Sequence, residues 1–157
     1  MAHEIYMHLD SIMGECNEIY HKNWIVLDGF SCSITSAFND ETMSGACEHG
    51  EMSISKLIDR SSPKLALATC NLTRFNEGII HVCNQNATGQ INSIVLECLI
   101  RGVRFLTYEL SGEDTSTDSI SLRYETIEWR YSYLDPHSLS GRGRIVTRWD
   151  TTSNSGG

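Results

Sequence analysis

The sequence has six cysteines and one close cysteine–histidine pair, the residue types that could support metal or thiol chemistry. Cys47 and His49 are separated by one residue, but two ligands do not make a zinc site. The sequence has no C-x-x-C pair, and neighbouring positions on a loop give no reason for the Cys47 thiol to be activated. We therefore expect no metal site and no catalytic cysteine. Most of the thiols should be reduced and packed as small apolar groups: Cys16, Cys32, Cys47, Cys70, Cys83 and Cys98.

Other catalytic motifs are missing as well. There is no G-x-S-x-G elbow, no H-E-x-x-H pair and no glycine-rich phosphate loop. The adjacent acids Asp40-Glu41 and Glu113-Asp114 lie in polar stretches, where a solvated surface is their ordinary role. Glu128, next to Trp129, is typical of the outward, salt-bridging face of a strand. The sequence therefore predicts a protein that is not an enzyme and that carries no cofactor.

The net charge of −8 is distributed unevenly along the chain. Residues 1–54 contain nine acidic residues and a single lysine, whereas residues 55–157 are neutral in sum. The basic residues do not form a long stripe, and their one cluster is Arg142, Arg144 and Arg148. A nucleic-acid partner is therefore not expected. Without a signal peptide or a long apolar stretch, we expect a protein made in the cytoplasm that does not insert into a membrane.

Alternation of apolar and polar residues dominates the sequence and predicts β-strands. Ile5, Met7 and Leu9 alternate with polar positions. Further strands are expected at residues 24–30, 78–85, 91–100 and 103–110. A turn at 86–89 should join the strand at 78–85 to the strand at 91–100. Residues 36–52 are instead expected to form a long acidic loop, and residues 151–157 a flexible tail.

The segment 119–134 changes its buried face partway along. Ile120, Leu122 and Tyr124 share one parity, whereas Ile127 and Trp129 share the other. The segment is also longer than an ordinary strand. A bulge or a sharp bend between Tyr124 and Ile127, as barrels use at their corners, explains both features.

One short helix interrupts the strands. Ser62 followed by Pro63 is typical of a helix start, because serine can accept a hydrogen bond from the first turn and proline loses no needed donor. Asp59 can add negative charge near the same end. We expect the helix to bury Leu65, Leu67 and Ala68. The sequence thus predicts a mainly β, small antiparallel β-barrel with one short α-helix, as a single domain over residues 1–157.

Several stretches, in order, resemble one known family. "MAHEIYMHLDSIMGEC" resembles its first strand and acidic turn, and "HKNWIVLDGF" its second strand after a His-Lys pair. "IDRSSPKL" is similar to its helix start, "LRYETIEWRY" to a late strand, and "RWD" followed by Asn154 to its last strand. The family is the haemolysin-coregulated protein (Hcp) family of type VI secretion systems. This chain departs from it at Gly50-Glu51, where family members usually have Gly-Lys.

The resemblance implies a fold and an assembly. Six β-barrel subunits would form a hexameric ring, and rings would stack into a hollow tube inside a contractile sheath on a baseplate. The VgrG spike would tip the tube, small effectors could occupy its lumen, and the protein would be secreted without a signal peptide. We expect the acidic segment to be a ring or subunit interface, with the arginines as its counterpart: Asp40, Glu41, Thr42, Met43, Glu48, Glu51, Arg142, Arg144 and Arg148. The alternative from composition alone is a monomeric ligand-binding β-barrel.

Overall fold

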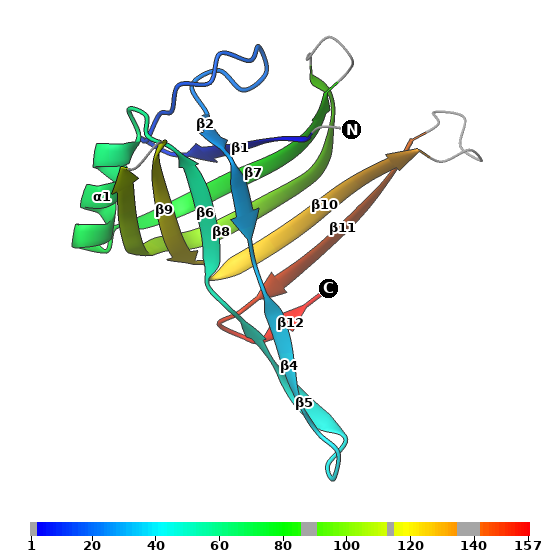
Figure 1. Cartoon of the computed structure of the whole chain (residues 1–157). Helices are drawn as coiled ribbons and strands as arrows, with labels where there is room; N and C mark the ends of the chain where they lie inside the picture. The colour runs from blue at the N-terminus through cyan, green and yellow to red at the C-terminus, as the bar shows by residue number, and fades with distance from the viewer. Residues whose placement is uncertain (1–2, 86–90, 113–114, 135–141) are drawn as a thin grey trace.

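The computed structural model describes residues 3–85, 91–112, 115–134 and 142–157 of the chain. Strands account for most of this part, and one helix lies against the end of the sheet (Figure 1). The elements are β1 (His3–Leu9), β2 (Ile25–Leu27), β3 (Gly29–Ser31), β4 (Ile34–Asn39), β5 (Ser44–His49), β6 (Met52–Leu57), α1 (Ser62–Asn71), β7 (Arg74–Gln85), β8 (Ile91–Gly112), β9 (Ser116–Arg123), β10 (Thr126–Leu134), β11 (Arg142–Asp150) and β12 (Ser155–Gly156). The turn expected at 86–89 and the acids Glu113-Asp114 lie outside the described residues.

All strand pairs are antiparallel, and most belong to one strongly curved sheet. Its main path runs β12-β11-β10-β8-β7-β1-β2, while β9 pairs with the other half of β8, β6 with β9, and β3 with β6. The strands β2 and β3 are consecutive, separated by Asp28, whose N–H donates to the Ser55 carbonyl in β6 (2.8 Å). The mainly β class with one helix is confirmed. Among the described strands, however, no ladder joins β2 to β3, so the sheet does not close into the expected barrel. The chain at Asp28 connects these two strands instead.

The core lies inside the curve of the sheet, because every second side chain of a strand points to that face. In β6, Met52, Ile54 and Lys56 are buried while the residues between them are exposed. The same face of the neighbouring elements completes one apolar cluster, which includes Met7, Ile25, Leu65, Ile80, Ile100, Phe105 and Leu122. Burial of these side chains is the main term that stabilises the fold.

The corner of the sheet forms where β9 ends and β10 begins. The predicted change of face between Tyr124 and Ile127 is confirmed as a bend, with the Glu125 N–H donating to the Arg101 carbonyl (2.8 Å). Opposite the bend, Gly102 adopts φ +66°, and a Cβ there would collide with the Glu125 side chain. The two strands expected at 91–100 and 103–110 are one strand, β8, which pairs with β10 before Gly102 and with β9 after it.

Helix α1 begins at the predicted place but with different contacts. Ser62 is its first residue, and the preceding Ser61 makes no side-chain cap. Instead, the Asp59 carboxylate accepts a hydrogen bond from the Ser61 N–H (2.9 Å). The prediction for Leu67 is wrong: the helix buries Leu65 and Ala68, and Leu67 is exposed, because it lies on the face turned away from β8.

Two segments expected to lack regular structure are strands. Residues 36–52 contain most of the β4–β5 hairpin, in which Ile34 pairs with His49 and Asn39 with Ser44. The tail at 151–157 folds back as β12 on β11, and the Thr151 N–H and hydroxyl both donate to the Glu125 carbonyl (2.8 Å each). Sequence composition predicted loops here because small polar residues hide the strand pattern.

All six cysteines are free thiols. Cys16, Cys83 and Cys98 are buried and Cys47 is half-buried, whereas Cys32 and Cys70 are exposed. Among the described residues, no helix has the length and hydropathy needed to cross a membrane.

Candidate assembly surfaces

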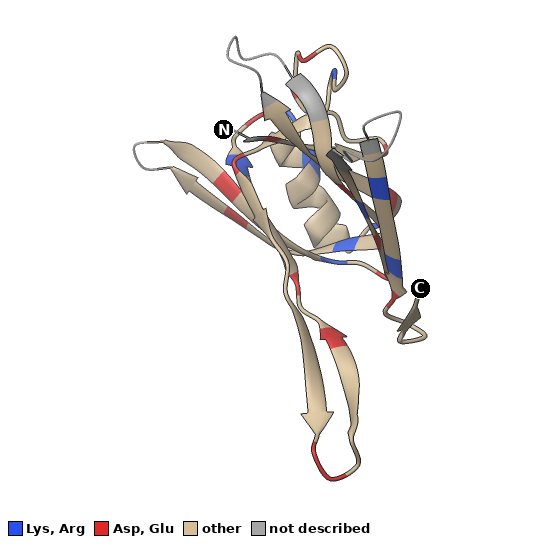
Figure 2. Cartoon of the chain, turned by 90° about the vertical axis from the view of Figure 1, so that its right-hand side faces the viewer, with Lys and Arg blue, Asp and Glu red and all other residues tan. Residues whose placement is uncertain are grey.

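The β4–β5 hairpin projects from the body of the molecule as a two-stranded arm (Figures 1 and 2). Every residue of β4 is exposed, and the hairpin makes its own separate sheet. Residues opposite each other in the register share a face. Ile34, Phe38 and Cys47 therefore lie on one face, whereas Ala37 lies with the polar residues of the other. The two large apolar side chains of β4 thus share one side of the arm that the chain itself leaves uncovered: Ile34 is 49% and Phe38 59% exposed.

The acidic end of the arm is its turn, Asp40 to Met43 (Figure 2). The Asn39 carboxamide oxygen accepts hydrogen bonds from the N–H groups of Glu41 (2.9 Å) and Thr42 (3.3 Å). These bonds form an Asx-type turn. All four residues of the turn are exposed, Met43 to 74%. The remaining predicted acids lie at the other end of the hairpin: Glu48 in β5 and Glu51 just beyond it, both exposed.

The arginine cluster lies elsewhere, on β11. Arg144 and Arg148 are exposed, and Arg148 forms an ion pair with Glu128 of β10 (3.0 Å). The backbone of Arg142 begins β11, but its side chain lies outside the described part. Among the described side chains, no ion pair joins these arginines to the acids of the arm. The structure therefore does not bring the two predicted surfaces together within one chain.

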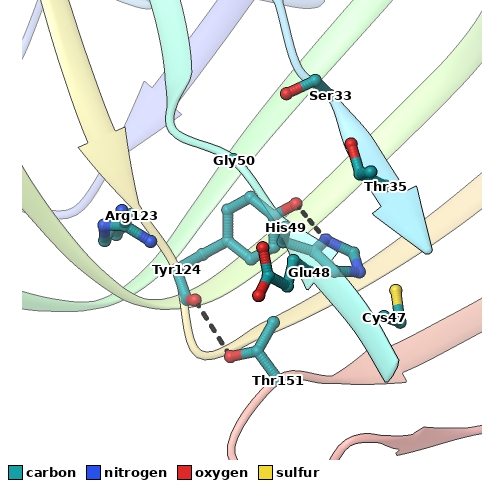
Figure 3. A pocket seen from close by; sticks show the side chains of 9 residues that line it. All are labelled: Ser33, Thr35, Cys47, Glu48, His49, Gly50, Arg123, Tyr124 and Thr151. Carbon is teal, nitrogen blue, oxygen red and sulfur yellow. Dashed lines mark hydrogen bonds between the residues drawn. The ribbon is translucent and has the colours of Figure 1, made fainter. Parts of the chain in front are cut away.

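A polar cavity of about 610 Å³ lies at the base of the arm (Figure 3). His49 and Cys47 of β5 line it together with Tyr124 at the sheet corner. The Nδ1 atom of His49 lies 2.6 Å from the Tyr124 hydroxyl. Burial lowers the pKa of His49 and raises the pKa of Tyr124 far above its usual range, so a neutral phenol donates to a neutral imidazole. His49 is thus engaged by Tyr124, which anchors the arm, and does not serve as a base for Cys47.

Sequence reasoning missed a chain of polar contacts centred on two buried histidines. His21, in the connection between β1 and β2, contacts Glu18, and its Nε2 atom lies 2.9 Å from Nδ1 of His81 in β7. The Nε2 atom of His81 lies 2.6 Å from the Glu97 carboxylate in β8. Arg130 of β10 forms ion pairs with both Glu97 (2.7 Å) and Glu128, and Glu128 also pairs with Arg148. The exposed Arg148 and the two buried histidines therefore belong to one network. The His-Lys pair before Trp24 was the available signal.

Burial and pairing act in opposite directions in this network. Burial lowers the pKa of His81, and the hydrogen bond to Glu97 only partly offsets that effect. Burial alone would raise the pKa of Glu97, but hydrogen bonds from His81 and Arg130 hold it below its usual range. Glu97 is therefore an ionised acceptor at neutral pH.

Comparison with known proteins shows which family this chain belongs to. The sequence matches the family described as "Type VI secretion system effector, Hcp" over residues 6–131. No curated protein matches the sequence significantly. A solved type six secretion system protein has a TM-score of 0.85 and 23% identity, with 99% of this chain and 100% of that chain covered.

Two further solved structures have the same fold. Hcp1 from Salmonella typhimurium has a TM-score of 0.79 and 21% identity, with 99% of each chain covered. Hcp3 from Pseudomonas aeruginosa has a TM-score of 0.64 and 16% identity, with 92% of this chain and 97% of that chain covered.

Proposed function

Because this chain belongs to the Hcp family of type VI secretion proteins, we propose that it is a structural subunit of the secretion tube. Residues 1–157 act as one Hcp-like domain. Six copies close into a ring, and rings stack into a tube that can carry small effectors in its lumen. The tube lies inside the contractile sheath on the baseplate and ends at the VgrG spike. The protein is made in the bacterial cytoplasm and leaves through this system, and it performs no catalysis.

The observation that carries the proposal is the exposed apolar face of the β4–β5 hairpin. A two-stranded hairpin standing alone in water is only marginally stable. Here Ile34 and Phe38 are exposed on one face of the arm, and Met43 is exposed at its tip. A second chain that covers this face would remove apolar surface from water and would hold the arm in place. In a ring every subunit gains the same contact, so one such arm per chain stabilises the whole assembly.

The monomeric ligand-binding alternative has less support. A binding barrel needs an open apolar interior. The inside of this curved sheet is filled by side chains such as Met7, Ile54 and Phe105, each no more than 1% exposed. The cavity at the base of the arm and a second one, beside β12, open to the surface and are lined by polar and charged groups as well as apolar ones.

The test is the mass and shape of the purified protein in solution. Native mass spectrometry and multi-angle light scattering should give about six times the subunit mass of 17.6 kDa. Negative-stain electron microscopy of the same sample should show rings with a central opening. A monodisperse monomer at tens of micromolar would contradict the proposal and would favour the ligand-binding alternative.

A further inference from the structure

The buried histidine pair raises a question of proton number. Three contacts run in series: Glu18 to His21, His21 to His81, and His81 to Glu97. An ionised carboxylate can only accept hydrogen bonds. Glu97 also accepts from Arg130 (2.7 Å), and Glu18 from the Tyr20 N–H (3.1 Å), so both carboxylates act as acceptors.

Two neutral imidazoles do not have enough protons for this chain. Each neutral ring carries one N–H, which gives two protons for three hydrogen bonds. If Nδ1 of His21 donates to Glu18 and Nε2 of His81 donates to Glu97, two bare nitrogens face each other at 2.9 Å. Two lone pairs at that distance repel, unless a positive charge lies between them.

We propose that the His21–His81 pair binds one proton more than its two neutral rings carry, and that this proton fastens residues 10–24 to the sheet. His21 is then an imidazolium that donates to Glu18 and to Nδ1 of His81. His81 is neutral and donates from Nε2 to Glu97. All three contacts are satisfied, and each ring nitrogen has one role.

The surroundings of His21 favour a cation. The Tyr6 ring stacks on the imidazole with centroids 4.5 Å apart and planes at 21°. An aromatic ring attracts a cation that lies over its face, as the His21 imidazole lies over Tyr6. The stacked Tyr6 ring therefore favours His21 as the ring that carries the extra proton.

The ion-paired groups of the network also balance in charge with this proton. The carboxylates Glu18, Glu97 and Glu128 face only two arginines, Arg130 and Arg148, and the imidazolium supplies the third positive charge. The other titratable groups around the pair come from three elements: Glu4, Tyr6 and His8 of β1, Cys16 in the connection to β2, and Cys83 of β7, whose Sγ lies 4.0 Å from Nε2 of His21.

The spacing favours a proton over a metal ion. Two Zn–N bonds at a tetrahedral angle would hold the nitrogens about 3.3 Å apart. The observed separation of 2.9 Å is that of an N–H···N hydrogen bond. The pair is thus a proton site that joins two segments sixty residues apart in the sequence.

Solid-state NMR of the intact protein, labelled with ¹⁵N in its histidines, tests the proposal. At pH 7.5 an exposed histidine is about nine-tenths neutral. We expect both nitrogens of His21 to be protonated, and His81 to have a protonated Nε2 and a bare Nδ1. The imidazolium signal should disappear in His21→Gln and remain in His49→Gln, a matched control that removes a histidine of the arm.

A second pair of variants tests the role of His81 as an acceptor. Glutamine can accept from His21 and donate to Glu97, so His81→Gln should keep the imidazolium, whereas His81→Leu should lose it. If every histidine ring of the unmodified protein is neutral at pH 7.5, the proposal is overturned. A stoichiometric transition metal found by elemental analysis, with both inner nitrogens shifted, would overturn it as well. Both results can be obtained whether or not the protein assembles into a hexamer, so they test this proposal separately from the proposed function.

Discussion

Lys56 and Asp118 form an ion pair at 3.0 Å in which both side chains are completely buried. The pair joins β6 to β9, and Ser62 donates to the same Asp118 oxygen (2.6 Å), so it also fixes the first residue of α1. Tyr108 donates to that oxygen from β8 (3.0 Å). A single carboxylate therefore holds three strands and the helix in place.

Removing one partner of this pair should cost more than removing both. Asp118→Ala leaves a buried lysine with only Asp59 as a charged partner, and we expect the free energy of unfolding to fall by about 3 kcal/mol. The double variant Lys56→Met, Asp118→Leu should lose less, because no buried charge remains. Urea unfolding at one protein concentration measures both. Equal losses in the two variants would mean that the charges are not coupled.

The apolar face of the arm should drive assembly. Phe38→Asp places a charge on that face, and we expect ring formation to weaken by about tenfold or more, because an unpaired carboxylate resists burial. Ala37→Asp is the matched control, since Ala37 lies on the opposite face of the same strand. Light scattering across a dilution series compares the two. If both variants assemble as the parent does, the arm does not contribute an interface.

The acidic turn should act between rings through charge. We propose that Asp40 and Glu41 face the basic cluster of another copy, where Arg144 and Arg148 are exposed. Changing both acids to lysine should reduce the number of stacked rings seen by electron microscopy. High salt should reduce stacking of the parent more than ring closure, because exposed charges are screened. Stacking that is the same in both proteins at low and high salt would leave the turn as a solubilising surface.

Acidification should destabilise the fold through His81. The pKa of His81 is lowered in the native state. Between about pH 6.5 and that lowered value, His81 therefore binds more protons in the unfolded chain than in the native protein. The free energy of unfolding should fall as the pH drops through this range, by at most about 1.4 kcal/mol per pH unit. Below the native pKa this loss levels off. His81→Gln should show a shallower slope between pH 7 and 5 in urea unfolding, and an unchanged slope would contradict the assignment.

Glu97 should add a second loss at lower pH. Its pKa is held below the usual range, so its contribution is present above about pH 4.3 and is lost as the pH falls towards its native value. Arg130→Met removes one of the groups that lower this pKa. In that variant the loss, measured by urea unfolding, should be complete at a pH nearer to 4.3 and should be smaller.

The buried thiols should be silent in the native protein. Burial raises the pKa of Cys83 to about 11 and of Cys98 to about 12, and it raises the pKa of Cys16. At pH 8 a thiol reagent should label the exposed Cys70 quickly and these three only after denaturation. Cys70→Ser should lower the number of rapidly labelled thiols by one. Six equally fast thiols in the native state would contradict the packing described above.

The local patterns of the sequence were sufficient for much of the fold. Alternation at Ile5, Met7 and Leu9 predicted β1, and the change of parity between Tyr124 and Ile127 predicted the corner. Such patterns are reliable because a strand turns successive side chains to opposite faces whatever it pairs with. The Ser62-Pro63 start predicted α1 for an equally local reason. The assembly residues were predicted from a resemblance, and the arm was expected as a loop because Ser36, Ala37 and Gly45 carry little apolar signal.

Tertiary structure alone decided which polar groups are buried and what they meet. Alternation in β6 places Lys56 on the core face with Met52 and Ile54, and only the fold supplies its partners there, Asp118 and Ser62. His21 and His81 come together only because β1 pairs with both β2 and β7. A local pattern assigns a side chain to a face, whereas strand register across long separations determines which groups share that face. The sequence by itself therefore determined the apolar strands of the sheet, the corner and the helix, whereas the pairing of distant strands determined the buried histidine pair, the ion pair and the uncovered arm.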